Sequence, residues 1–113
     1  MNNYLDGFDR KEVTLAAMQY VEKGKTVAMA ESFTVKAAGD GDCFIGVCTD
    51  VNNYNASVLL SGYVKITYSG EAPVCGFNTL SADANGGIRK DADGRSILVT
   101  DVDTAAMTCG IIL

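Results

Sequence analysis

The sequence has no histidine among its 113 residues. Histidine is the usual base that activates a serine or cysteine nucleophile, and it is the commonest neutral metal ligand. No motif sets a lysine or a carboxylate beside a candidate nucleophile instead, and the acidic residues stand in expected turns or at strand ends. We therefore predict that the protein is not an enzyme, has no catalytic residues and uses no cofactor.

Long apolar runs and basic clusters are also missing. No run approaches the roughly 20 residues that a membrane span needs, and residues 1–13 lack the basic and then apolar pattern of a signal peptide. Nine Lys and Arg against fourteen Asp and Glu give a formal net charge of −5, which disfavours nucleic acid and anionic membranes as partners. We expect synthesis in a cytoplasm, where cysteines stay reduced.

The four cysteines lack the spacing of a zinc site. Structural zinc sites usually take their ligands in pairs spaced Cys-x₂₋₄-Cys. Cys43 and Cys48 are instead five residues apart in a strand-like run, which points them to opposite faces. Cys75 and Cys109 are isolated. The sequence predicts four free thiols that pack as small buried hydrophobic residues, with no metal bound.

Two acidic turns, GDGD at 39–42 and DADG at 91–94, raise the question of calcium. An EF-hand loop needs about a dozen residues and ends in a bidentate glutamate, and neither turn has these features. Aspartate and glycine are also the residues that tight turns select for backbone reasons. We predict ordinary turns at both places.

From Lys25 onward, short alternating runs follow one another between turn signals. Proline occurs once and glycine twelve times, which favours many tight turns. Turn signals every 8–12 residues or so predict a small barrel or sandwich. The expected strands lie within 25–30, 32–38, 43–51, 56–70 (interrupted at Gly62), 73–82, 88–90, 95–103 and 108–113. The predicted fold is all-β: a single domain over residues 9–113, built of short antiparallel strands with at most one short helix.

Residues 9–24 fit two structures. They open with a capping-box pattern and carry apolar residues at helical spacing. The run EVTLAAM within them also alternates as a strand does, with Val13, Leu15 and Ala17 on one face. Taken alone, the residues slightly favour the helix and leave the strand open.

Residues 1–8 form a polar N-terminal arm that carries Tyr4, Leu5 and Phe8. These apolar side chains precede the first strand and have no local apolar neighbours. We expect the arm to become ordered on a partner, with the aromatic side chains as anchors. The alternative is that Phe8 folds back onto the protein's own barrel.

The other aromatic residues invite comparison with a stacking platform for single-stranded nucleic acid. Such platforms lie in a positively charged groove, and this protein is acidic. We expect core and cross-strand packing to account for these residues instead, namely Phe44, Tyr54, Tyr63, Tyr68 and Phe77.

The order of the turns and strands resembles that of a known family. A Lys23-Gly24 turn precedes a short strand, and Ile45-Gly46-Val47 follows a Gly-Asp turn. A strand bracketed by Gly62 and Gly70 comes next, and the chain closes with a strand over 109–113. From about Val13 to the end, this pattern is similar to that of the small capsid cement, or head-decoration, proteins of tailed bacteriophages.

The resemblance implies an all-β fold in which Val13 to Met18 is a strand, and no catalytic or cofactor residues. It also implies binding to the outer face of the major capsid protein lattice, self-association, often as a homotrimer, and a place on the virion exterior. Such a protein would stabilise the closed shell by mass action. A small β-barrel protein-binding module and another virion component, from the tail or for head completion, remain alternatives.

Overall fold

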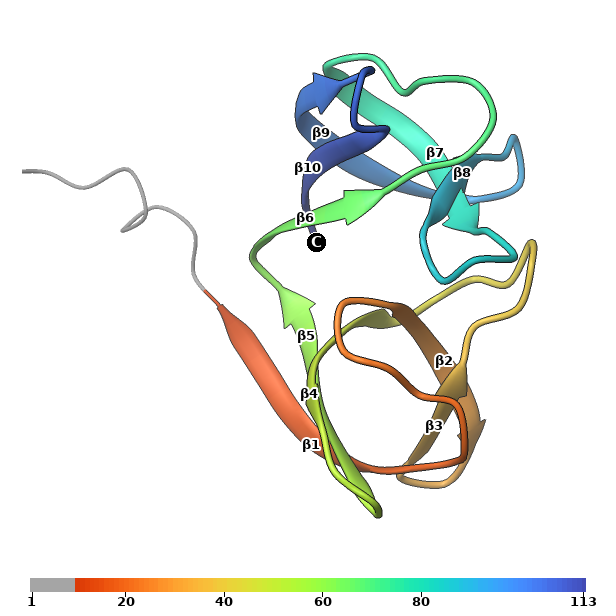
Figure 1. Ribbon diagram of the computed structural model, residues 1–113, viewed down its shortest axis with the longest axis vertical. Coiled ribbons are helices and arrows are strands. Elements are labelled where there is room, and N and C mark those ends of the chain that lie inside the picture. The colour runs from red at the N-terminus through yellow and green to blue at the C-terminus, as the bar shows by residue number, and fades with distance from the viewer. Residues whose placement is uncertain (1–9) are drawn as a thin grey trace, which may run out of the picture.

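The structure, a computed structural model, describes residues 10–113, which form ten strands in two sheets and no helix. The first five strands close a barrel in the order β1-β3-β2-β4-β5, and the last five form a sheet in the order β6-β10-β9-β7-β8 (Figure 1). The strands are β1 (Lys11–Ala17), β2 (Thr26–Glu31), β3 (Thr34–Ala37), β4 (Gly46–Val51), β5 (Asn55–Ser61), β6 (Tyr63–Thr67), β7 (Gly76–Ala82), β8 (Ile88–Lys90), β9 (Arg95–Asp103) and β10 (Thr108–Ile112). The predicted all-β fold is confirmed.

The segment that fitted both a helix and a strand is a strand. β1 pairs antiparallel with β5 and parallel with β3, so it closes the barrel. Val13, Leu15 and Ala17 pack against the buried residues of the barrel. Since alternate residues of a strand share one face, their period of two fills the barrel interior. The preference for a helix, drawn from the residues alone, is therefore wrong. The parallel pairing of β1 with β3 was also not expected.

Two strands begin later than the sequence indicated. β4 starts at Gly46, where an added Cβ would meet the backbone of Leu59 on β5, so only glycine allows this close approach. β7 starts at Gly76 because the side chain of Asn78 replaces the pairing of the residues before it. Its amide donates to the carbonyl of Val74 at 2.7 Å, and its Oδ1 accepts from the Val74 N–H at 3.1 Å.

One hydrophobic core joins the two sheets. Phe44 and Val47, which belong to the barrel half of the chain, lie in the same buried cluster as Leu80 and Ile97 of the second sheet. Backbone hydrogen bonds also cross the junction, including one from Gly41 N–H to the Ala82 carbonyl at 2.8 Å. A second, smaller core fills the barrel itself. The two sheets therefore pack as one unit.

The C-terminal strand lies inside the second sheet, as the sequence predicted. β10 pairs with β6 on one side and with β9 on the other. Cys109 and Ile111 are fully buried. Among residues 10–113 there is no helix long and apolar enough to cross a membrane.

Candidate binding surfaces

The predicted partner-contact residues Tyr4, Leu5 and Phe8 lie outside the described residues. The arm therefore stays a prediction. Arg10, the first described residue, lies beside β6, with its Nη1 3.5 Å from the carbonyl oxygen of Tyr63.

The cysteines divide into two pairs. Cys48 and Cys109 are buried, whereas Cys43 and Cys75 are exposed, so the expectation of four buried thiols is wrong for the second pair. Burial, together with the nearby Asp101 carboxylate, raises the pKa of Cys109 from 9.0 to about 11. A thiol that keeps its proton at neutral pH is a poor nucleophile. Within residues 10–113, no three Cys, Asp or Glu side chains are placed to hold a metal.

The aromatic residues also fall into two groups. Phe44 and Tyr68 are buried, as predicted. Tyr54 and Phe77 instead expose 77% and 74% of their surface, so core packing does not account for them. Three further large side chains missed in the sequence, Met18, Tyr20 and Phe33, are also exposed. Their signal was weak: an aromatic residue sits between two strands, where turns usually carry polar residues.

A row of four large apolar side chains crosses the outer face of the second sheet; we refer to it as the apolar row. Tyr63 on β6 lies opposite Ile112 on β10. Ile112 in turn lies opposite Leu98 on β9, and Leu98 opposite Phe77 on β7. Residues in direct register share a face of the sheet, and the neighbours of this row on the opposite face, among them Ile111 and Val99, are buried.

Tyr63 is held in place at one end of the apolar row. Its hydroxyl donates to Asp101 Oδ1 at 3.3 Å. Burial raises the pKa of Tyr63, and the negative charge of Asp101 raises it further. At the other end, Phe77 reaches solvent on β7. The apolar row thus has a fixed end and an accessible end.

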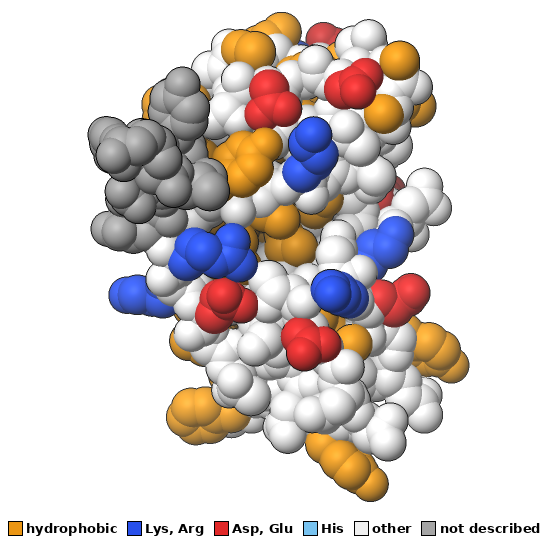
Figure 2. Space-filling model, turned by 60° about the vertical axis from the view of Figure 1, so that its left-hand side comes forward, with side chains coloured by type: hydrophobic (Ala, Val, Ile, Leu, Met, Phe, Trp, Pro, Cys, Tyr) orange, Lys and Arg blue, Asp and Glu red, His pale blue; other side chains and the backbone are white. Residues whose placement is uncertain are grey.

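A second set of exposed side chains lies at the far end of the barrel; we call it the barrel end. It consists of Met18, Tyr20, Phe33 and Tyr54. Backbone hydrogen bonds bring these segments together, from Ala16 N–H to the Phe33 carbonyl at 2.9 Å and from Ala17 N–H to the Tyr54 carbonyl at 2.8 Å. Hydrophobic side chains project from this lower end of the molecule in Figure 2.

Two aromatic residues of the barrel end have left-handed backbone conformations. Tyr20 has φ 71° and Phe33 has φ 56°. For a bulky residue this conformation is an outlier. The two side chains expose 82% and 80% of their surface, so burial does not offset the strain. Backbone strain of this kind is concentrated at functional sites.

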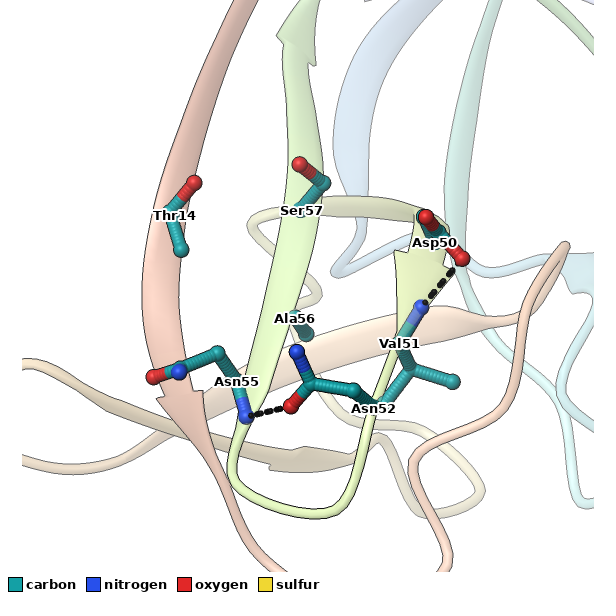
Figure 3. Close-up of a pocket in the computed structure, with 7 residues that line it drawn as sticks. All are labelled: Thr14, Asp50, Val51, Asn52, Asn55, Ala56 and Ser57. Carbon is teal, nitrogen blue, oxygen red and sulfur yellow. Dashed lines mark hydrogen bonds between the residues drawn. The ribbon is translucent and has the colours of Figure 1, made fainter.

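A polar pocket lies on the barrel wall beside the β4–β5 turn (Figure 3). It has a volume of about 200 Å³ and is lined by Thr14, Asp50, Val51, Asn52, Asn55, Ala56 and Ser57. Thr14 and Asp50 both lie opposite Ser57, on β1 and β4, so three polar side chains stand in one row. Asn52 accepts a hydrogen bond from the Asn55 N–H at 2.8 Å, which ties the turn together.

Neither a protein-family model nor a curated protein sequence matches this chain.

Proposed function

We propose that this protein is a capsid decoration protein, which binds the outer surface of the major capsid protein lattice of a tailed bacteriophage and stabilises the head. It acts without catalysis or a cofactor. It is made in the host cytoplasm, resides on the capsid exterior and self-associates, with a homotrimer as the expected form. Nucleic acid and membrane are not among its partners. The similarity of its strand and turn order to that of the cement proteins supports this proposal.

The apolar row is the observation that carries the proposal. Its members are Tyr63, Ile112, Leu98 and Phe77, and they span four strands, about 14 Å at the usual strand spacing. Interface cores favour aromatic and large apolar residues and are depleted of charge. A row of such residues on the open face of a sheet suits flat docking against another protein surface.

The charge of the protein agrees with an external position. The formal net charge is −5, which disfavours contact with the packaged genome and favours the face of the shell that points away from it. Stabilisation follows from mass action, because a protein that binds the closed lattice and not its separated subunits shifts the equilibrium toward the lattice.

Co-sedimentation with capsids tests the proposal. The capsids are assembled from the major capsid protein of the phage genome that encodes this chain. Phe77→Ser, at the exposed end of the apolar row, should weaken binding about tenfold or more. Tyr54→Ser, an equally exposed aromatic residue at the barrel end, is the matched control and should bind as the parent does.

Three outcomes would count against the proposal. The parent protein fails to sediment with capsids, which favours a protein-binding module inside the cell. It binds as a single ring of copies at one vertex, which favours a head-completion or tail component. It binds over the whole shell but Phe77→Ser binds equally well, which removes the apolar row from the interface.

A further inference from the structure

We propose that the barrel end, together with the polar pocket beside it, binds a neutral glycan. The site lies in the barrel half of the chain, whereas the apolar row lies on the second sheet. The inference is therefore independent of the proposed binding to the capsid.

The three turns that build the barrel end carry no charged residue. They comprise 18–20, 32–33 and 52–55, and their side chains are Met18, Gln19, Tyr20, Ser32, Phe33, Asn52, Asn53, Tyr54 and Asn55. In a protein with 20% charged residues, a surface of aromatic rings, amides and a hydroxyl stands apart. All nine of these residues are exposed.

The aromatic rings cannot be explained by stability. Tyr20 and Phe33 occupy left-handed backbone positions that glycine or asparagine would adopt at lower cost. Tyr54 sits in a turn between two asparagines and is almost fully solvated. Flat, solvated rings on neighbouring turns offer a surface for a flat apolar ligand face.

The pocket supplies the complementary polar groups. Thr14 and Ser57 contribute hydroxyls and Asp50 a carboxylate, and the three stand on adjacent strands in register. The Oδ1 of Asn52 is used by the Tyr54 and Asn55 N–H groups, so its amide nitrogen is left to donate; Figure 3 shows this nitrogen pointing away from the turn and toward the strand that carries Ser57.

A sugar ring fits both halves of this site. A pyranose has an apolar face of C–H groups, which stacks on aromatic rings, and an edge of hydroxyls that donate and accept hydrogen bonds. Amides, hydroxyls and a carboxylate serve such an edge in both directions. The one charged group, Asp50, is an anion, so acidic glycans are disfavoured. A protein interface would more commonly carry a charged rim, which these turns lack.

A nuclear magnetic resonance titration of the full chain tests the inference. The probes are maltohexaose, cellohexaose and chitohexaose, each at about 10 mM, which detects a Kd of about 1 mM. We expect at least one of them to shift the amide signals of residues 18–20, 32–33 and 52–57. Hexagalacturonate, an acidic counterpart, should leave these signals in place.

Variants connect the shifts to the site. Tyr54→Ala removes an exposed ring and should lower affinity about tenfold while the fold is kept. Thr14→Val keeps the shape of the side chain and removes its hydroxyl, and it should lower affinity severalfold. Phe77→Ala, on the second sheet, is the matched control and should bind the oligosaccharide as the parent does.

The inference is overturned if no neutral oligosaccharide shifts the signals of the three turns, or if the shifts persist unchanged in Tyr54→Ala. Equal binding of hexagalacturonate would overturn its neutral character. If capsids and not oligosaccharides perturb the barrel end, the surface is a protein interface and the glycan assignment is wrong. Loss of capsid binding in Phe77→Ser with glycan binding intact separates this site from the proposed capsid interface.

Discussion

Tyr63 on β6 reaches across β10 to donate a hydrogen bond to Asp101 on β9, at 3.3 Å. The residue beneath this contact is Gly110, where an added Cβ would lie 2.5 Å from the Tyr63 hydroxyl oxygen and would also meet the Asp101 carboxylate. The absence of a side chain on β10 therefore lets the outer face of the sheet carry this contact.

Gly110→Ala should lower the free energy of unfolding by about 1–3 kcal/mol, because the new methyl group overpacks the site. Urea denaturation at equilibrium measures this loss. In a Tyr63→Ala background the same substitution should cost less, since one of the two obstructing side chains is gone. Equal costs in both backgrounds would show that Tyr63 is not the obstacle.

Ile111→Ala should destabilise the protein by about 2–5 kcal/mol, because Ile111 is fully buried in the core that joins the sheets. Ile112→Ala, its neighbour on the outer face, is the control and should cost clearly less. Thermal unfolding of both variants gives the comparison. Deletion of residues 111–113 should abolish cooperative folding; a truncated chain that melts within a few degrees of the parent would contradict the central place of β10.

Stability should decline between about pH 9 and 11. The pKa of Cys109 is raised from 9.0 to about 11 in the folded protein by burial and by Asp101. Between these values the unfolded chain has lost the thiol proton while the folded protein keeps it, so unfolding becomes more favourable as pH rises. Denaturation midpoints across this range measure the slope, and Cys109→Ala should flatten it. An unchanged slope in that variant would assign the effect to other groups.

Alkylation of the native protein should modify two thiols, those of Cys43 and Cys75, and leave Cys48 and Cys109 protected. In denaturant all four should react, because no disulfide joins them. Intact mass after iodoacetamide treatment counts the modified thiols. Fewer than four in denaturant would indicate an oxidised or blocked cysteine.

Phe33→Asn should raise the free energy of unfolding by about 1 kcal/mol, because asparagine tolerates the left-handed conformation at φ 56° better than phenylalanine does. The same substitution should weaken binding at the barrel end, since the ring is lost. Tyr54→Asn is the control: it is equally exposed and has no positive φ, so it should leave stability unchanged. A destabilised Phe33→Asn would mean that the ring contributes to folding.

Much of the fold could be predicted from local patterns. The strand over 95–103 and the short one over 88–90 appear with the expected bounds, because turn residues flank each of them. The late starts of β4 and β7 could not be predicted, since they depend on Leu59 and Asn78, which the sequence does not mark as neighbours.

The candidate surfaces were harder to predict than the strands. Phe77 and Leu98 belong to the apolar row only because of the register between β7 and β9, and alternation within one strand does not say which face stays open. At the barrel end, Phe33 and Tyr54 come together through hydrogen bonds to β1, far away in the chain. Sequence patterns report local preference, whereas these surfaces arise from long-range pairing.

The place of β1 in the barrel has a consequence for synthesis. Lys11 pairs with Ser61, so the first strand of the domain cannot be sealed until the ribosome has released about 50 further residues. Val13 and Leu15 stay without their barrel partners during that interval. Closure between such distant segments is intrinsically slow, and we expect the nascent chain to recruit a chaperone such as trigger factor at β1 before the barrel forms.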